Sequence, residues 1–338
     1  MSNAPTIGVI GCGAIAERYH LPALASRRDQ LGGLVLVDAN AERVAKLADQ
    51  FEASRHATNH LDVLEELDAV IVATPPVAHR AVTIDFLERD VHVLCEKPLA
   101  PSARDAKIMV EAAANSSATL SVNTTRRLFP AYVKVRELLA SIDLGAVREI
   151  TYYDGQLFSW PAASPFRFRP GSGTPRGALL DKGIHALDAV CWWLGTKPRV
   201  VSCRTDSFGG PEAVASVQLD HDGSPVTIHV SALGRLDNTF TIRCEAGEIS
   251  SGVENWSRLV VRRGSKSEHL NLGGSESSYT DFSNTLTDNF LAVAAGDAAP
   301  LLPAANALAA IELLDECYAV AERFEMPWYD DLAVLDGP

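Results

Sequence analysis

The sequence contains no stretch that could cross a membrane. No uncharged run approaches the roughly 18 to 20 residues that a spanning helix requires. The N-terminus also lacks the basic leader and long apolar core of a signal peptide, because its apolar residues begin at once in a strand-like pattern. We therefore expect a cytoplasmic protein that does not bind membranes.

Paired cysteines and metal-binding clusters are absent as well. None of the cysteines lies in a Cys-x-x-Cys pair or in a cluster with histidines, and the six are Cys12, Cys95, Cys191, Cys203, Cys244 and Cys317. This scatter is typical of reduced thiols in a cytosolic protein and not of a disulfide framework or a zinc site. The sequence predicts no bound metal.

Basic residues are outnumbered by acidic ones. The chain has 30 Lys and Arg against 43 Asp and Glu, which gives a formal net charge of −13 at pH 7. A strongly negative protein has no general affinity for nucleic acid or for an anionic membrane. With 338 residues, 47% of them hydrophobic, the chain is long enough for two domains with substantial cores.

Short apolar runs alternate with helical patterns in the first third of the chain. The segments between these runs have helical spacing, and the runs themselves lie at 6–10, 34–38, 68–76, 91–98 and 119–123. Continuous apolar strands that alternate with helices indicate a parallel sheet covered on both faces. We predict a doubly wound α/β domain over residues 1–123.

The pattern changes after Asn123. Period-two alternation at 226–230 and 240–244 is typical of half-buried antiparallel strands, and the segment HDGS at His221–Ser224 predicts a turn between two strands. Helical spacing is found near 130–141, 279–295 and 304–324. We predict an α+β domain over residues 124–338 whose sheet is mainly antiparallel.

The segment VIGCGAIAERYH contains the pattern Gly11-x-Gly13-x-x-Ala16. It follows a predicted strand and opens a predicted helix, which is the context in which this pattern indicates dinucleotide binding. Gly11 permits a tight turn, and Gly13 lets a pyrophosphate approach the backbone at the helix N-terminus, where free N–H groups favour negative charge. The loop residues expected to contact the dinucleotide are Gly11, Cys12, Gly13, Ala14 and Ile15.

An acidic residue ends the second predicted strand. Asp38 lies 25 residues beyond Gly13, and a carboxylate there can accept both hydroxyls of the adenosine ribose while it repels a 2′-phosphate. The sequence therefore favours NAD over NADP. Arg43 lies nearby and could weaken this preference, but we interpret it as a solvated helix residue.

The segment GALLDKGIHALD, at 177–188, places Asp181, His185 and Asp188 on one side of a predicted helix, at spacings of four and three. An Asp four residues before a His can hold one ring nitrogen and leave the other for proton transfer. The same pattern also fits a helix N-cap at Asp181 and a satisfied histidine at the edge of a core. This segment alone leaves both interpretations open.

Four motifs follow one another along the chain: GVIGCGAIA, VATPPVAH, CEKPLA and GALLDKGIHALD. Together they resemble the Gfo/Idh/MocA family of NAD(P)-dependent sugar and cyclitol oxidoreductases, over nearly the whole chain. The resemblance implies a Rossmann domain followed by a large open-sheet domain whose exposed face packs against another subunit. It implies a homodimer or homotetramer, a small polyhydroxylated substrate and a nicotinamide dinucleotide cofactor, while the preference for NAD over NADP rests on Asp38 alone.

The resemblance also implies roles for the residues that match these motifs. It assigns catalysis to Lys97, His185 and Asp181, with Lys97 near the reacting carbon. The residues expected near the nicotinamide half of the cofactor are Thr74, Pro75, Pro76, His79, Glu96 and Lys97. Asn123 lies at the domain junction, where members of the family line the substrate site.

The residue types themselves suit the oxidation of a secondary alcohol. A neutral imidazole such as His185 can take the hydroxyl proton, and an ammonium such as Lys97 can stabilise the developing alkoxide. Aromatic and arginine side chains suit a polyhydroxylated ligand, and the candidates for substrate contact are Asn123, Arg126, Trp160 and Arg167. Lys182 stands between the two catalytic candidates of its segment without an assigned role.

The sequence therefore predicts an NAD-dependent oxidoreductase that interconverts a ring CH–OH and a ketone on a sugar, cyclitol or nucleotide-sugar. One alternative is a redox-neutral glycosidase or lyase that uses tightly held NAD for transient oxidation. The other is a regulatory protein that binds NAD without catalysis, and the intact Lys97, Asp181 and His185 argue against it.

Overall fold

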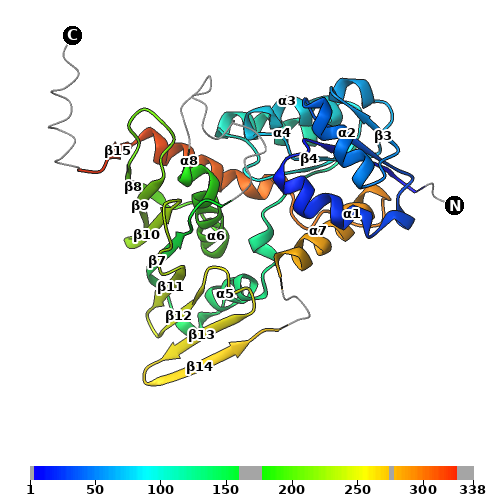
Figure 1. Ribbon diagram of the computed structural model, residues 1–338. Helices are drawn as coiled ribbons and strands as arrows, with labels where there is room; N and C mark the ends of the chain where they lie inside the picture. Colours follow the sequence, from blue (N-terminus) through cyan, green and yellow to red (C-terminus); the bar gives the residue numbers. More distant parts are fainter. Residues whose placement is uncertain (1–3, 160–176, 274–277, 326–338) are drawn as a thin grey trace, which may run out of the picture.

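The computed structural model describes residues 4–159, 177–273 and 278–325. Two sheets organise these residues, and Figure 1 shows the first at the blue, N-terminal part of the chain and the larger second sheet in green and yellow. The predicted fold class is confirmed: the first sheet is parallel and doubly wound, and the second is open and mainly antiparallel. Within the described residues, no helix is long and apolar enough to cross a membrane.

The first sheet has the strand order β3-β2-β1-β4-β5-β6, with every pair parallel. Its strands are β1 (Thr6–Ile10), β2 (Gly33–Val37), β3 (Arg55–Ala57), β4 (Ala69–Val72), β5 (His92–Cys95) and β6 (Leu120–Val122). The order reverses beside β1, and ligands of open α/β sheets bind at such a reversal, beyond the carboxyl ends of the strands. The short strand β3 has no counterpart among the predicted strands.

Helices cover both faces of the first sheet, as the continuous apolar strands predict. Val9 and Ile71 face one helical layer, whereas the neighbouring Ile10 and Val70 face the other. The helices of this part are η1 (Ala16–His20), α1 (Leu21–Ala25), η2 (Arg28–Gln30), α2 (Ala41–Gln50), η3 (His60–Val63), α3 (Pro76–Leu87) and α4 (Ala103–Ala114).

The second sheet has the strand order β14-β13-β12-β11-β7-β10-β9-β8-β15. Its strands are β7 (Val147–Gly155), β8 (Arg199–Thr205), β9 (Val214–His221), β10 (Ser224–Ser231), β11 (Thr239–Cys244), β12 (Gly247–Gly252), β13 (Arg258–Arg263), β14 (Lys266–Asn271) and β15 (Ala321–Arg323). The predicted turn at His221–Ser224 joins β9 to β10, and Asp222 and Gly223 have the positive φ angles of 51° and 85° that such a two-residue hairpin loop requires.

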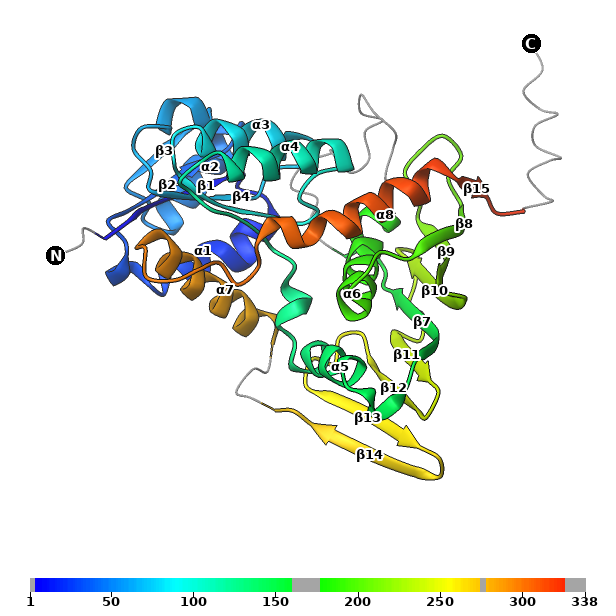
Figure 2. The ribbon, with the colours of Figure 1, turned by 180° about the vertical axis from the view of Figure 1, so that it is seen from behind.

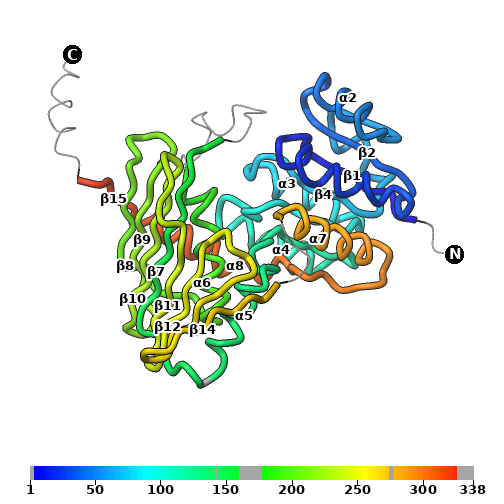
Figure 3. The backbone as a smooth tube through the Cα atoms, turned by 60° about the horizontal axis from the view of Figure 1, so that its bottom comes forward, coloured from blue at the N-terminus to red at the C-terminus, as the bar shows by residue number. Residues whose placement is uncertain are grey.

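One face of the second sheet is packed against helices. Figures 1 and 2 show α5, α6 and α8 on the side of this sheet that faces the first sheet, and Figure 3 shows its strands in a row with these helices on that same side. The helices of this part are η4 (Thr125–Leu128), α5 (Pro130–Ala140), η5 (Ile142–Leu144), η7 (Leu179–Gly183), α6 (Ile184–Leu194), η8 (Ala304–Ala307) and α8 (Leu308–Ala319).

The chain returns to the first sheet near its C-terminal end. Helix α7 (Tyr279–Ala294) buries Leu286 and Phe290 in the same apolar cluster as Val9, and it lies beside α1 in Figure 1. Arg27 also pairs with Asp288 of this helix. The boundary placed at residue 123 therefore remains a prediction, since part of the segment 124–338 packs on the N-terminal sheet.

The predicted helix at 304–324 is wrong at its end. Helical residues stop at Ala319, and Ala321–Arg323 forms β15, which pairs in parallel with β8. The edge of a sheet presents unpaired backbone N–H and C=O groups. Strand β15 pairs with these groups along β8. The backbone N–H of Phe324 also donates to the carbonyl of Thr205 at 2.8 Å.

A buried ion pair joins three segments of the second part. Arg127 donates from Nε and Nη2 to the two carboxylate oxygens of Asp188, at 2.9 and 2.7 Å, and also to the carbonyl of Asn306 at 2.8 Å. Asp188 is thus a structural partner of Arg127 and not part of an acidic strip with Asp181. Burial raises the pKa of Asp188 above its usual range, although Arg127 opposes this shift.

We predict that Asp188→Ala lowers the free energy of unfolding by about 3–5 kcal/mol, because it leaves Arg127 buried without its counter-charge. Urea denaturation followed by circular dichroism measures this loss. The matched control is Asp49→Ala, which removes an exposed carboxylate and should change stability by less than about 0.5 kcal/mol. A loss below about 1 kcal/mol in Asp188→Ala would contradict the structural role of the pair.

Candidate active site

The glycine-rich loop after β1 is packed on one side and open on the other. Gly11 has φ of 98°, and a Cβ there would lie 2.6 Å from the backbone of Ala73 and Thr74. Gly13 is the opposite case, since a Cβ built on it meets no atom within 4 Å. The loop therefore leaves space where a pyrophosphate would approach the backbone at the start of the following helix.

Asp38 and Arg43 both hold this loop. Asp38 accepts hydrogen bonds from the backbone N–H groups of Cys12 and Asn40, at 2.7 and 2.8 Å. Arg43 donates to the carbonyl of Cys12 and, at 2.9 Å, to Glu17. The interpretation of Arg43 as a solvated helix residue was wrong, because its guanidinium reaches back across the loop to these acceptors.

The loop after β4 carries the expected residues Thr74, Pro75 and Pro76, which lie partly exposed beside the glycine-rich loop. The hydroxyl of Thr74 is buried and has no hydrogen-bond partner among the described residues. An unsatisfied buried hydroxyl is unfavourable unless a ligand completes its hydrogen bonds. This group, with the space at Gly13, fits a bound dinucleotide.

His79 is buried beneath the loop after β4, and its place near the nicotinamide remains a prediction. Its ring is fully buried, with Nε2 2.8 Å from the carbonyl of Thr74 and Nδ1 3.0 Å from that of Pro98. Burial lowers the pKa of His79 below its usual range. Because both ring nitrogens face backbone carbonyls, this residue ties the loop after β4 to the segment after Lys97.

Glu96 is the buried centre of the loops that follow the strands. Its Oε1 accepts from His20 and Asn123, each at 2.7 Å, and its Oε2 accepts from the backbone N–H of Lys97 at 3.1 Å. Burial raises the pKa of Glu96, but these hydrogen bonds and the nearby charges outweigh it, and the pKa lies below its usual range. Glu96 and Asn123 are thus directed toward each other, so that they position the site more than they line it.

Lys97 and Asp181 meet where the two sheets face each other. The ammonium of Lys97 donates to Oδ1 of Asp181 at 3.1 Å and to its backbone carbonyl at 2.9 Å. No hydrogen bond joins Asp181 to His185 in the part of the chain that the structure describes. The reason is local, because η7 is a π turn, in which residues four apart no longer lie one above the other as in an α-helix.

The ring of His185 is held in its neutral form. Burial and then the charges of Arg126 and Lys97 place its pKa well below its usual value of 6.5, against the opposing charge of Asp181. Neither ring nitrogen has a hydrogen-bond partner among the described residues. His185 therefore carries a free nitrogen lone pair beside the Lys97–Asp181 pair.

A second charged group completes this surface. Arg126 donates to the hydroxyl of Tyr152 at 2.6 Å and to Oδ2 of Asp154 at 2.8 Å, and Lys182 lies 3.7 Å from Oδ1 of Asp154. Asp154 shares the buried phase of β7 with Ile150 and Tyr152. In the sequence, the feature that could have revealed this group of charges is Asp154, a carboxylate at a position of β7 whose side chain is expected to be buried. Trp160 and Arg167, the other expected substrate residues, lie outside the described residues.

Glu212 positions the helix that carries these residues. It accepts hydrogen bonds from the backbone N–H groups of Gly177 and Leu179, at 2.8 and 2.9 Å, and from the hydroxyl of Tyr318 at 2.7 Å. The two backbone donors lie at the N-terminus of the helical segment that begins with η7, where the helix itself leaves N–H groups unsatisfied. Glu212 lies in a loop without a local motif, so the sequence offers no signal for it.

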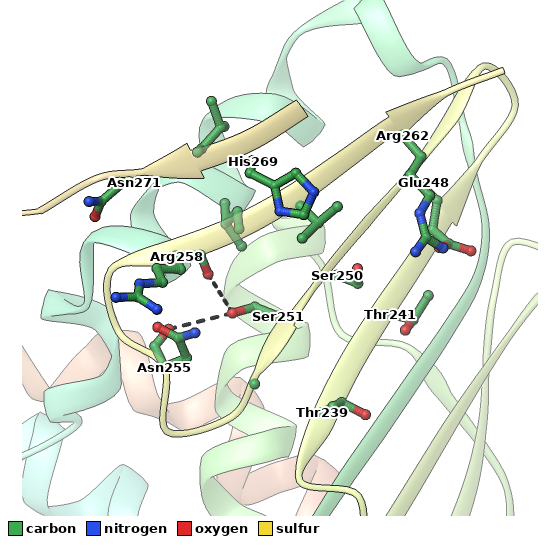
Figure 4. A pocket seen from close by; sticks show the side chains of 14 residues that line it. Thr239, Thr241, Glu248, Ser250, Ser251, Asn255, Arg258, Arg262, His269 and Asn271 are labelled. Atoms are coloured by element: carbon green, nitrogen blue, oxygen red, sulfur yellow. Dashed lines mark hydrogen bonds and ion pairs between the residues drawn. The ribbon is translucent and has the colours of Figure 1, made fainter. Parts of the chain in front are cut away.

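A shallow polar trough lies elsewhere, on the open face of the second sheet. Figure 4 shows Thr239, Thr241, Ser250 and His269 along its strands. Its charged residue Glu248 is paired with Arg243 and Arg262. The trough contains none of the predicted site residues, so the Lys97 region remains the candidate active site.

Comparison with known proteins agrees with both parts of the fold. Residues 6–124 match the family GFO_IDH_MocA, described as an oxidoreductase family with an NAD-binding Rossmann fold. Residues 132–250 match the GFO/IDH/MocA C-terminal domain. Together the two matches cover well over half of the chain.

Individual relatives are named as dehydrogenases or reductases. Inositol 2-dehydrogenase 4 of Saccharopolyspora erythraea is 29% identical over 73% of this chain and 72% of its own length. A dTDP-3,4-didehydro-2,6-dideoxy-alpha-D-glucose 3-reductase of Streptomyces violaceoruber is 30% identical over 67% and 65%. The solved structure of the 3-ketoreductase KijD10 from Actinomadura kijaniata, with NADP and TDP-benzene, aligns with a TM-score of 0.79 over 96% of this chain and 100% of its own. Its identity of 20% supports the fold alone.

Proposed function

The chain belongs to the Gfo/Idh/MocA oxidoreductase family, and we propose that it interconverts a ring CH–OH group and a ketone on a sugar, cyclitol or nucleotide-sugar, with NAD as cofactor. The observation that carries this proposal is the Lys97–Asp181 pair together with a neutral His185 that has no hydrogen-bond partner among the described residues, beside loops that fit a dinucleotide. The names of the two relatives support it, since each describes oxidation or reduction of a ring carbon.

Each residue has a distinct task in the oxidative direction. His185 accepts the proton of the substrate hydroxyl through its free ring nitrogen. Lys97 stabilises the alkoxide that develops. Asp181 holds the ammonium of Lys97 through two contacts, and thus acts on Lys97 rather than on His185. The nicotinamide of bound NAD supplies the acceptor for the hydride that leaves the carbon.

The choice of NAD over NADP follows from the charges at the end of β2. The carboxylate of Asp38 lies against the glycine-rich loop, where it disfavours a 2′-phosphate. The guanidinium of Arg43 is engaged with Cys12 and Glu17, which leaves it poorly placed to compensate the charge of a 2′-phosphate.

We also expect a second copy of the chain on the open face of the second sheet.

We predict that NAD and one class of polyhydroxylated substrate give NADH, measured by its absorbance across a panel of sugars, cyclitols and nucleotide-sugars. Lys97→Met and His185→Ala should each lower kcat/KM by about 10²–10⁴-fold, the contribution typical of acid–base and charge-stabilising groups. The control Lys266→Met changes an exposed lysine of β14 and should leave the rate unchanged. NAD binding without NADH formation on any substrate would contradict the proposal.

The pH dependence tests the state of His185 separately. A general base must be unprotonated, so the rate of oxidation falls as pH drops through its pKa. Because burial and the charges of Arg126 and Lys97 lower that pKa, kcat/KM should hold down to pH values below 6.5. A profile of kcat/KM against pH measures the midpoint of this acid limb. A midpoint at or above pH 6.5 would show that the general base is not His185.

A further inference from the structure

Lys182 is a largely buried cation whose ion pair with Asp154 is long and is shared with another cation. Its side chain is 18% exposed, and its Nζ lies 3.7 Å from Oδ1 of Asp154. It makes no hydrogen bond to any of the residues that the structure describes. Since the ammonium has three N–H donors and its contact with Asp154 is long, donors remain for a bound molecule.

The carboxylates around it are already engaged. Asp154 forms its close contact with Arg126, at 2.8 Å, and Asp181 forms its contact with Lys97, at 3.1 Å. Asp154 is therefore shared between Arg126 at close range and Lys182 at longer range. Taking an ammonium out of water with only one distant counter-charge is unfavourable, so Lys182 is less well compensated than Lys97 and Arg126, which each have a closer carboxylate.

We propose that Lys182, beside Arg126, binds an anionic group of the substrate, a carboxylate or a phosphate, close to the reacting carbon. This inference rests on the proposed function, because it adds the charge of the substrate to the oxidation described above. A neutral hydroxyl could accept a hydrogen bond from Lys182 but would leave its charge uncompensated. An anion both accepts the hydrogen bond and compensates the charge, and charge-assisted hydrogen bonds are shorter and stronger than neutral ones.

The position of Lys182 assigns the anion to the substrate and not to the cofactor. Its neighbours Asp154 and Arg126 belong to β7 and η4, in the second part of the chain. The glycine-rich loop that fits a pyrophosphate follows β1 in the first sheet. Lys182 lies three residues before His185 in the same helical segment, so we expect a group bound by Lys182 to lie near the proposed base.

The test compares neutral and anionic probes of the same shape. Isothermal titration calorimetry on the NADH complex measures the binding of D-glucose, D-glucuronate, D-glucose 6-phosphate, myo-inositol and myo-inositol 1-phosphate. We expect one anionic probe to bind at least about tenfold more tightly than its neutral counterpart. Whether the carboxylate or the phosphate binds more tightly distinguishes the two sources of the anion.

Variants at one position test whether Lys182 causes this preference. Lys182→Met should weaken binding of the anionic probe by about tenfold or more and of its neutral counterpart by less than about threefold. Lys182→Arg keeps the charge and should keep the preference, which shows that the site still folds, and Lys266→Met should bind like the wild type. Neutral probes that bind as tightly as anionic ones would overturn the inference, as would an equal loss for both in Lys182→Met.

NADH formation, measured in separate samples that contain NAD and the same probes and variants, separates this inference from the proposed function. Rapid oxidation of a neutral probe, without tighter binding of its anionic form, keeps the oxidation and overturns the anion site. Binding of an anion through Lys182 without NADH supports the anion site and counts against the oxidation.

Discussion

The candidate site depends on the buried carboxylate of Glu96. This one group accepts hydrogen bonds from His20, in the helix that follows the glycine-rich loop, from Asn123 beyond β6, and from the backbone of Lys97 beyond β5. An ionised carboxylate is stable in the interior only when such donors surround it. Glu96 thereby fixes three chain segments at the carboxyl edge of the first sheet, and it directs Lys97 toward the second sheet.

The position of Lys97 also determines the charges that surround His185. Lys97 reaches Asp181 in η7, and the adjoining Arg126 and Lys182 add positive charge near His185. Because like charges nearby disfavour the imidazolium, the ring stays neutral and can accept a proton. Glu212 holds the N-terminus of this helical segment from behind. In the proposed site, two buried carboxylates thus fix the backbone: Glu96 beyond β5 of the first sheet and Glu212 before β9 of the second.

Local sequence patterns were sufficient for the parts of the molecule that local physics decides. The glycines of the first loop, the apolar strands and the His221–Ser224 turn all lie where their spacing predicts. The resemblance to a known family added the architecture of the second sheet. These features depend on residues that are near one another in the chain, or on motifs shared with other proteins.

Contacts between distant segments could not be predicted in this way. Spacing suggested that Asp181 orients His185, but the π turn moves the carboxylate to Lys97, 84 positions earlier in the chain. Arg43 and His79 are engaged by backbone carbonyls that no side-chain pattern reveals. The weakly compensated charge of Lys182 becomes visible only when Asp154 and Arg126 are brought beside it.

The most direct measurement of where the reaction takes place is a crystal structure of the NADH complex with the tightest-binding probe. We expect the oxygen on the reacting carbon to lie within about 2.6–3.2 Å of both Lys97 Nζ and a ring nitrogen of His185. An oxygen beyond the reach of both side chains, or a probe bound in the trough over β11–β14, would contradict this assignment of the active site.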